Sequence, residues 1–270
     1  MKKVLITGAN SYIGTSFERW VSQYPDRYKV DTVDMKDGSW RDKDFSYYDV
    51  VFHVAGIAHV SSDPKLKDLY YRVNRDLTIE TAKKAKAEGV KQFIFMSSII
   101  VYGDSSKKKR VIDRNTIPSP SNFYGDSKLQ AEIGLKALED ENFKIVILRP
   151  PMIYGKGSKG NYPKLSKDNL CEFIRLMIDN EERGLFFPQN AEYVKTSEMV
   201  RLIAEVHGRK IRLTKVFNPI IKMIFGVNMV NKVFGNLVYD RSMSVYSNGD
   251  YWIRDFRKSI ELSEVMFKNV

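Results

Sequence analysis

The first half of the chain alternates short apolar runs with segments of helical period. Runs of strand length cover residues 4–6, 30–33, 50–54, 93–96 and 144–148. Helix-forming segments lie between them, over residues 12–24, 65–88 and 122–141. Continuous apolar strands separated by helices are typical of a parallel sheet covered on both faces. We therefore predict an α/β fold, with a Rossmann-type doubly wound parallel sheet over residues 1–155.

The pattern changes after Pro150 and Pro151. Several glycines and a proline indicate a long loop over residues 155–163. Helical segments follow at residues 171–180, 197–207 and in the C-terminal tail. We expect residues 156–270 to form mainly a smaller substrate-binding domain over the strand ends, with some segments returning to the Rossmann domain.

Composition is that of an ordinary globular protein. The chain has 270 residues, of which 43% are hydrophobic, enough for one large domain with a smaller one. The single cysteine, Cys171, excludes an internal disulfide and suits a reducing compartment. Strand-like residues begin at Lys3 and leave no room for a signal peptide. We expect a cytoplasmic protein.

Residues 216–238 are the best candidate for a membrane span, and the pattern argues against one. A span needs about 20 predominantly apolar residues, whereas Lys222, Asn228 and Lys232 interrupt this segment. We predict amphipathic helices packed in the smaller domain and no transmembrane segment. A weak association with a membrane surface is the alternative.

The formal charge of +11 indicates an anionic partner. No zinc-finger spacing or nucleic-acid module accompanies it, so we do not expect nucleic acid. The basic run at residues 107–110 is either a solvated loop or a loop near a phosphate-bearing ligand. His53, His59 and His207 have no metal-binding spacing, and we predict no metal site. His53 lies in an apolar strand, which favours a hydrogen-bonded core residue.

The segment Thr7-Gly-Ala-Asn-Ser-Tyr-Ile-Gly follows a strand and opens a helix. Such a turn presents backbone amides and a helix N-terminus to a pyrophosphate. Gly8 allows the tight turn and Gly14 the close approach of helix and strand. Asp34 ends the second strand about 20 residues beyond Gly14, where a carboxylate accepts ribose hydroxyls. A carboxylate there repels the 2′-phosphate of NADP, so we predict NAD, although Lys36 lies close by.

Tyr124 and Lys128 are spaced to share one helix face, one turn apart. A free tyrosine has a pKa of about 10, and we expect the ammonium and the nicotinamide cation to lower it. Tyr124 then accepts the proton of an alcohol while hydride leaves. Ser97 and Ser98 follow another strand, at the edge where parallel sheets bind ligands. A hydroxyl there would orient the substrate oxygen.

These residues resemble the extended short-chain dehydrogenase/reductases, the NAD-dependent epimerase/dehydratase family that acts on nucleotide sugars. The resemblance covers most of the chain. It implies that Ser98, Tyr124 and Lys128 are catalytic. It also implies a set of cofactor-binding residues, comprising Gly8, Ser11, Tyr12, Ile13, Gly14, Asp34, Ala55, Gly56, Asn74, Tyr124, Lys128 and Pro151.

The chain departs from the family at four places. Ser11 replaces the middle glycine of the family's glycine motif, and Trp40 stands where an aspartate usually contacts the adenine side, so Trp40 is expected to stack there. Met152 aligns with an asparagine of UDP-galactose 4-epimerase. The strand that usually carries an arginine for the diphosphate before Asp168-Asn169-Leu170 is not evident. Either the chain lacks this segment or residues are missing from the sequence, and the match of both flanking halves favours the second.

The resemblance implies a homodimer that binds a UDP-sugar or a similar nucleotide sugar. The first functional hypothesis is an NAD-dependent 4-epimerase acting by transient oxidation at C4. The alternative is an NAD(P)H-dependent 4-ketoreductase in surface-polysaccharide synthesis. Ile99 and Ile100 after Ser98 argue against a dehydratase, which usually has an acidic pair there. A non-catalytic dinucleotide sensor is disfavoured by the intact Tyr–Lys pair. For the diphosphate we expect a mobile loop between Tyr162 and Asp168, with Lys164 or Lys167 supplying charge.

Overall fold

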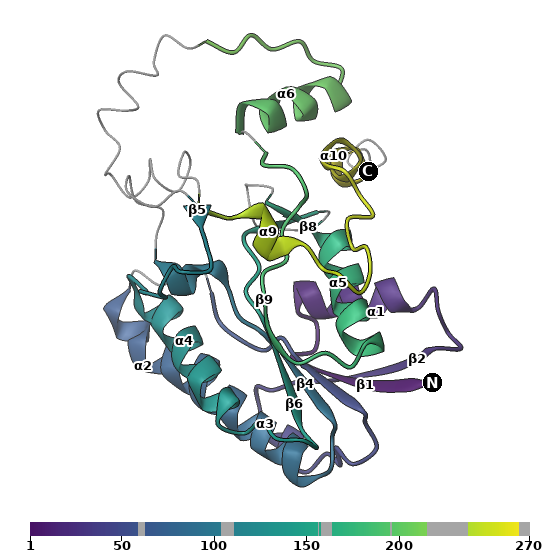
Figure 1. Ribbon diagram of the computed structural model, residues 1–270, viewed down its shortest axis with the longest axis vertical. Helices are drawn as coiled ribbons and strands as arrows, with labels where there is room; N and C mark the ends of the chain where they lie inside the picture. The colour runs from purple at the N-terminus through teal and green to yellow at the C-terminus, as the bar shows by residue number, and fades with distance from the viewer. Residues whose placement is uncertain are drawn as a thin grey trace.

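A six-stranded parallel sheet forms the centre of the molecule (Figure 1). The computed structural model describes residues 1–58, 63–103, 111–155, 157, 164–194, 196–214 and 237–264. The strand order is β2-β1-β3-β4-β6-β9. The strands are β1 (Lys2–Thr7), β2 (Tyr28–Val33), β3 (Val50–His53), β4 (Gln92–Met96), β6 (Lys144–Leu148) and β9 (Gly184–Phe186). The predicted Rossmann-type doubly wound sheet is confirmed.

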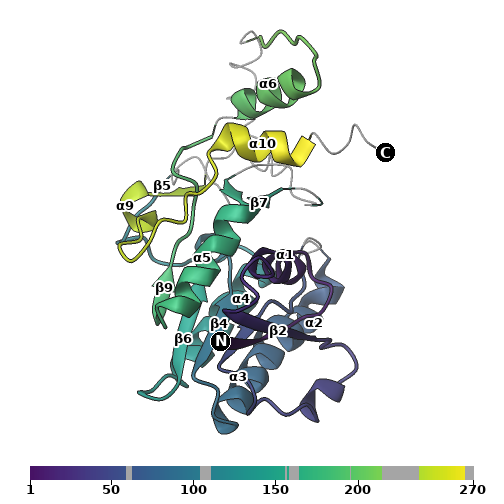
Figure 2. The same cartoon turned by 90° about the vertical axis from the view of Figure 1, so that its right-hand side faces the viewer.

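Helices cover both faces of this sheet (Figures 1 and 2). One layer contains α1 (Tyr12–Val21) and α5 (Lys167–Asp179), and the other contains α3 (Leu77–Ala87) and α4 (Phe123–Lys136). The expected continuous helix over residues 65–88 is divided. It comprises η2 (Pro64–Leu66), α2 (Lys67–Tyr70), a π-helical segment η3 (Tyr71–Asp76) and α3. Such π-helical turns are often found at functional sites.

Alternation along the strands divides the core into two layers. Val4 and Ile6 of β1 pack with Phe17 of α1 in one fully buried cluster, which also contains α5 residues. Leu5, between them in sequence, joins the opposite cluster with Ala82 of α3. Successive side chains of a strand point to opposite faces, so β1 needs apolar residues at every position. This explains the continuous apolar run seen in the sequence.

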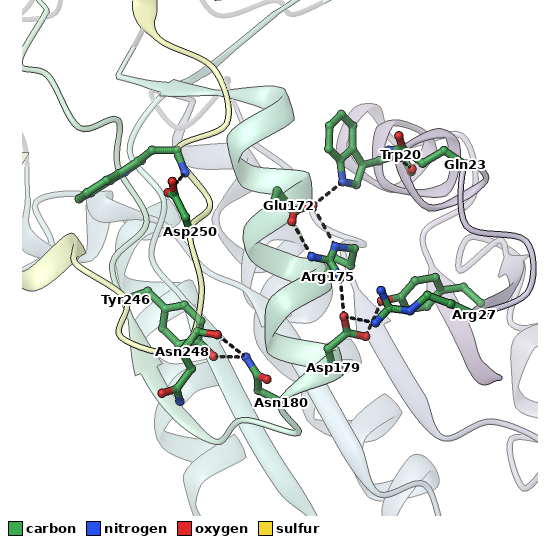
Figure 3. A network of polar contacts seen from close by, with 12 residues as sticks. Trp20, Gln23, Arg27, Glu172, Arg175, Asp179, Asn180, Tyr246, Asn248 and Asp250 are labelled. Atoms are coloured by element: carbon green, nitrogen blue, oxygen red, sulfur yellow. Dashed lines mark hydrogen bonds and ion pairs between the residues drawn. The ribbon is translucent and has the colours of Figure 1, made fainter.

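The α1–α5 pair is joined by a partly buried ionic network (Figure 3). Arg175 contacts Glu172 at 2.6 Å and Asp179 at 2.5 Å along α5. Glu172 also accepts a hydrogen bond from the indole of Trp20 in α1 at 3.0 Å. Arg27, beyond the end of α1, contacts Asp179 at 2.9 Å. These contacts hold the two helices side by side.

Short elements build the region above the sheet. The two-residue strands β7 (Ile153–Tyr154) and β8 (Leu165–Ser166) pair in parallel, as do β5 (Val111–Ile112) and β10 (Val238–Tyr239). Helices α6 (Thr196–Val206) and α10 (Phe256–Glu264) pack through Met199, Leu202, Phe256 and Ile260. The short helix α9 (Arg241–Ser244) follows β10. Two turns, η1 (Ser39–Arg41) and η4 (Ile99–Tyr102), follow β2 and β4.

Segments from both halves of the chain therefore contribute to the sheet layers, because α5 and β9 lie beyond residue 155. The predicted amphipathic helices of residues 216–238 fall almost wholly outside the described residues, as does the basic run at 107–110. Among the helices that the structure describes, none combines the length and apolar character needed to span a bilayer.

Candidate active site

Gly8 closes the turn between β1 and α1. Its φ of 116° lies in the left-handed region, and a Cβ there would lie 2.8 Å from the backbone nitrogen of Ala55. The amides of Gly8 and Ala9 donate to the Val33 carbonyl at 2.9 and 3.0 Å. The turn is thus held against the ends of β2 and β3. Because the strand order reverses around β1, this is the switch point where open parallel sheets bind ligands.

Ser11, in place of the family's middle glycine, is the N-cap of α1. Its Oγ accepts a hydrogen bond from the Gly14 amide at 3.2 Å. A Cβ on Gly14 would lie 2.6 Å from this Oγ and 2.9 Å from a methyl carbon of Ile6. Tyr12 and Ile13 begin the helix, where backbone amides have no intrahelical acceptor. The serine therefore stabilises the helix start while first-turn amides remain available for a pyrophosphate.

Asp34 follows β2 directly, and 45% of its side chain is exposed. One carboxylate oxygen accepts a hydrogen bond from the Lys36 amide at 3.0 Å. The Lys36 ammonium is 3.9 Å from the other oxygen and is itself 88% exposed. Asp34 is thus placed to accept hydroxyl groups at the carboxyl end of β2, and Lys36 is a weak, solvated partner.

The expected stacking of adenine on Trp40 is wrong. The Trp40 side chain lies in η1 and is only 1% exposed, although no ligand covers it. Its ring packs against Phe45, and the Arg41 guanidinium lies 4.6 Å from the ring centre. Burying this large apolar ring in the core stabilises the fold more than leaving it exposed at the site would. No exposed face of the ring is left for the adenine.

Gly56 and Asn74 connect the end of β3 to α4. A Cβ on Gly56 would lie 3.0 Å from Asn74 Oδ1 and 3.2 Å from Lys128 Nζ. Asn74, completely buried in η3, accepts from the Ile57 amide at 2.9 Å and donates to the Ile57 carbonyl at 3.1 Å. It also donates to the Ser127 hydroxyl at 3.2 Å. Asn74 therefore affects the site by fixing the position of the backbone at Ile57.

His53 is the hydrogen-bonded core residue that the sequence predicts. It is fully buried, with Nδ1 2.7 Å from the Thr7 hydroxyl and Nε2 3.1 Å from the Thr78 hydroxyl. The Thr78 hydroxyl donates to the Asn74 carbonyl, so it accepts from His53 Nε2–H, and Nδ1 accepts from Thr7. Burial lowers the His53 pKa to about 3. The neutral ring thus bridges β1, β3 and α3.

Tyr124 and Ser98 meet where η4 contacts the start of α4. Asn122 caps α4 by accepting from the Gly125 amide at 2.9 Å. A Cβ on Gly125 would lie only 2.7 Å from the Ile100 carbonyl oxygen, so the helix contacts η4 closely. The Ser98 hydroxyl lies close enough to the Tyr124 phenol to lower its pKa. The predicted serine and tyrosine are thus adjacent in space.

The pKa of Tyr124 differs from the sequence-based expectation. Burial raises it to about 12, against the opposing effect of the nearby Ser98 hydroxyl, and the nearby Tyr70 raises it further. The sequence predicts that the Lys128 ammonium and the nicotinamide cation lower this pKa. Lys128 is not among the groups that shift it, so desolvation decides the direction and the phenol is protonated at neutral pH.

Lys128 is 5% exposed, and its side chain extends to the end of β4. Its ammonium donates to the Met96 carbonyl at 2.9 Å and lies 4.7 Å from the centre of the Phe95 ring. Burial lowers its pKa to about 8, and the negative charge of Glu132 opposes this shift. The ammonium therefore stays charged at neutral pH and is held at the end of β4, beside Gly56.

The sequence reading missed a buried polar cluster behind Lys128. Arg149, at the end of β6, forms an ion pair with Glu132 of α4 and donates to the Tyr102 hydroxyl at 2.7 Å. The Ser97 hydroxyl donates to the same Glu132 carboxylate. A glutamate four residues after Lys128, on the same helix face, together with an arginine ending an apolar strand, was the available signal.

The segment after β6 lies beside η4. The Pro150 carbonyl accepts from the Ile99 amide at 3.0 Å, and Pro151 is buried next to it. Met152 is 44% exposed. The strand that seemed absent before Asp168 exists as the two-residue β8, which contains no arginine. Of the expected mobile loop, residues 164–168 form β8 and the start of α5, whereas Tyr162 and Pro163 lie outside the described residues.

The residues present fit an adenine dinucleotide. The backbone of Ala55 leaves no room for a side chain at Gly8, and the side chains of Ser11 and Ile6 leave none at Gly14. The N-terminus of α1 opens at the switch point, and Asp34 follows β2. A dinucleotide turn on a doubly wound sheet, followed by Ser98, Tyr124 and Lys128, defines an extended short-chain dehydrogenase/reductase. Residues 4–218 match the model of the NAD dependent epimerase/dehydratase family, and the chain belongs to this family. It is an NAD-dependent sugar enzyme.

Curated relatives and solved structures agree with this assignment. The chain is 29% identical to UDP-glucose 4-epimerase of Vibrio cholerae, over 75% of each chain. It is 30% identical to N-acetyl-alpha-D-glucosaminyl-diphospho-ditrans,octacis-undecaprenol 4-epimerase of Escherichia coli, over 75% of this chain and 71% of the relative. UDP-N-acetylglucosamine 4-epimerase from Bacillus cereus shares the fold over the full length of both chains, with a TM-score of 0.73 and 14% identity.

Proposed function

We propose that the chain is an NAD-dependent nucleotide-sugar 4-epimerase of the UDP-glucose/UDP-galactose type, or of the N-acetylated type. The observation that carries the proposal is the placement of the Ser98 hydroxyl beside the Tyr124 phenol, one helical turn from the buried Lys128 and beside a dinucleotide turn. Two relatives named as 4-epimerases support it. Both are named for a sugar that is joined to a diphosphate.

NAD, when bound, would supply the acceptor for the C4 hydride and return it to the other face of the resulting ketone. Tyr124 takes the proton of the 4-hydroxyl as hydride leaves and gives it back in the reverse step, so the cycle has no net redox change. Ser98 holds the phenol and orients the reacting oxygen. The charged ammonium of Lys128 favours the phenolate through space.

A 4-ketoreductase is the second candidate. Met152 is 44% exposed and stands where the resemblance to 4-epimerases places an asparagine. The same Ser98 and Tyr124 would protonate the oxygen of a 4-keto sugar, but each turnover would consume one NAD(P)H. The two functions therefore differ in the requirement for added reductant.

The proposal includes a cytoplasmic homodimer. For the dimer, Ile133 of α4 is 63% exposed and places an apolar side chain on the outward side of that helix. For the compartment, the one cysteine, Cys171, is buried and forms no disulfide. Sedimentation of the wild-type chain and of Ile133→Glu tests the dimer. A monomeric wild-type chain would contradict it.

Incubation with UDP-glucose and UDP-N-acetylglucosamine, without added nucleotide cofactor, tests the main proposal. We expect the C4 epimer to appear in the proton NMR spectrum. Tyr124→Phe should abolish the reaction. Tyr47→Phe should not, because Tyr47 is a surface residue that is 44% exposed. Turnover of a 4-keto sugar only with stoichiometric NAD(P)H would favour the ketoreductase.

A further inference from the structure

A small pocket lies at the N-terminus of α5, outside the Ser98–Tyr124 site. It is lined by Gly155, by Ser166, Lys167 and Asp168 at the start of α5, and by residues of α10 including Ser259 and Ser263. Its volume is about 40 Å³. A single water needs roughly 10–15 Å³ on the same measure. The pocket therefore has room for a few waters or for one tetrahedral oxyanion.

Ser166 presents an unused hydroxyl to this pocket. It occupies the N-cap position of α5 but makes no capping hydrogen bond through its side chain. The residue is only 4% exposed, and within the described part of the chain its hydroxyl has no hydrogen-bond partner. The hydroxyls of Ser259 and Ser263 differ, because both donate to backbone carbonyls at 2.8 and 2.7 Å. Ser166 is the donor left for a ligand.

Side chains that do not line the pocket fix the position of Ser166. Its amide donates to Asn190 Oδ1 at 2.9 Å, and the same oxygen accepts from Asn169 of α5 at 3.2 Å. Asn190 in turn donates to the Tyr154 hydroxyl at 3.3 Å. These three side chains are all at most 5% exposed. The Ser166 hydroxyl is thus held in place at the wall of the pocket, where a ligand or water can reach it.

The charges around the pocket favour an anion. Lys167 is 3.8 Å from one oxygen of Asp168, and Arg254 is 3.5 Å from the other. Two cations thus share one carboxylate, which leaves an excess positive charge beside the pocket. The N-terminus of α5 adds the positive end of a 13-residue helix. Amides of its first turn have no intrahelical acceptors.

The pocket adjoins the dinucleotide turn. Gly155 separates the two, since a Cβ there would lie 2.9 Å from Lys167 Cβ and 3.1 Å from the Tyr12 hydroxyl. Tyr12 is the first residue of α1 and Lys167 the first of α5. The two helices lie side by side, with α10 above the start of α5 (Figure 2). The side chains of the first residues of two helices therefore meet at Gly155.

We propose that this pocket binds a phosphoryl group through the Ser166 hydroxyl, the Lys167 ammonium and the first amides of α5. The group can belong to the diphosphate of the sugar substrate, to the cofactor, or to free phosphate. All three present the same tetrahedral oxyanion. The proposal concerns binding alone and does not depend on which reaction the enzyme catalyses.

Calorimetric titration with inorganic phosphate, on protein free of nucleotide, tests the pocket without turnover. We expect millimolar binding that weakens at least about tenfold in Lys167→Ala and in Ser166→Ala, the loss typical of a charge-assisted hydrogen bond. Phosphate bound at the α1 turn is unaffected by these changes. Lys258→Ala is the matched control, because this lysine of α10 is exposed and does not line the pocket.

Removal of the Ser166 hydroxyl should leave the melting temperature unchanged, since that group neither caps α5 nor pairs with a described residue. Titrations of the same variants with NAD and with UDP identify the source of the phosphoryl group. Weaker NAD binding assigns the pocket to the cofactor, weaker UDP binding assigns it to the substrate, and a change with phosphate alone assigns it to the free ion. Isotherms of Ser166→Ala and Lys167→Ala equal to wild type for all three compounds would overturn the proposal.

Discussion

Glu132 and Arg149 form an ion pair in which 2% and 4% of the side chains are exposed, with NH2 and Oε2 2.5 Å apart. The Nε atom of Arg149 also donates to Oε1 of Glu132 at 3.0 Å. The pair joins the middle of α4, which carries Tyr124 and Lys128, to the end of β6. Because Ser97 and Tyr102 satisfy the remaining polar atoms of the pair, α4 is fixed at its inner face.

Breaking this pair should destabilise the protein strongly. Glu132→Ala leaves a buried guanidinium without its counter-charge, and we expect a loss of about 3–5 kcal/mol of unfolding free energy. Glu80→Ala is the matched control. It removes a surface pair with Arg41 whose side chains are 46% and 51% exposed, and it should cost about 0–1 kcal/mol. Urea denaturation measures both, and equal small losses would show that the buried pair has no structural role.

Tyr124→Phe should remove the chemistry and spare cofactor binding. The loss of the acid–base group should lower turnover by about 10²–10⁴-fold or more. The phenol lies beside Ser98, and its removal leaves the turn at Gly8 and the Asp34 carboxylate intact, so NAD affinity should stay near that of the wild type. Steady-state kinetics and NAD titration check the two statements, and near-normal turnover by the variant would exclude Tyr124 as the base.

Lys128→Met should lose both activity and NAD affinity. The ammonium lies 3.2 Å from the position of a Cβ on Gly56, beside the cofactor-binding backbone, and it is the buried cation on the helix face of Tyr124. The Tyr124 pKa is raised to about 12, chiefly by burial, and a neighbouring cation favours the phenolate. The loss of this cation should therefore move the acidic limb of the pH–rate profile upward. An unmoved limb with unchanged NAD affinity would contradict the dual role.

Asp34 should select NAD over NADP. Its half-exposed carboxylate can accept ribose hydroxyls and repel a 2′-phosphate, and Lys36 is too solvated to reverse this. We expect Asp34→Ser to narrow the difference between the two dissociation constants. Titration of both cofactors against both proteins is the test, and a wild-type preference for NADP would assign control to Lys36.

Lys164 should make stability depend on pH. Its ammonium donates to the Leu237 carbonyl at 2.8 Å, and burial lowers its pKa to about 8 from the ordinary 10.5. Below pH 8 both states are protonated and the folded state bears the full cost of burying the charge. Between pH 8 and 10.5 the unfolded state binds more protons, so stability rises with pH. Lys164→Met should show a smaller rise in thermal unfolding, because Lys128, whose pKa burial also lowers to about 8, still contributes in the variant. A rise identical to that of the wild type would refute the assignment.

The sequence was sufficient for the sheet and for the placement of Ser98, Tyr124 and Lys128, because a continuous apolar strand and a one-turn spacing have direct geometric meaning. It was insufficient for features that depend on whether a side chain is buried. Trp40 could be placed near the adenine side by position in the chain, but only the packing against Phe45 shows that its ring is in the core. The sign of the Tyr124 pKa shift likewise depends on desolvation, which spacing does not contain.

Other features depend on partners distant in sequence. Glu132 and Arg149 are 17 positions apart, and their pairing follows from the adjacency of α4 and β6. The division of residues 65–88 into four helical pieces reflects the contacts that Asn74 makes with Ile57 and Ser127, which override the helix propensity of the segment.

The most direct test of the account follows the hydrogen atom at C4. UDP-glucose deuterated at C4 is incubated with the wild-type chain and its bound NAD, without added reductant, and the products are analysed by NMR. We predict the C4 epimer with deuterium retained at C4, because hydride leaves and returns within one site while Tyr124 handles only the hydroxyl proton. Loss of the deuterium to solvent, or turnover that requires stoichiometric NAD(P)H, would contradict the proposed epimerase.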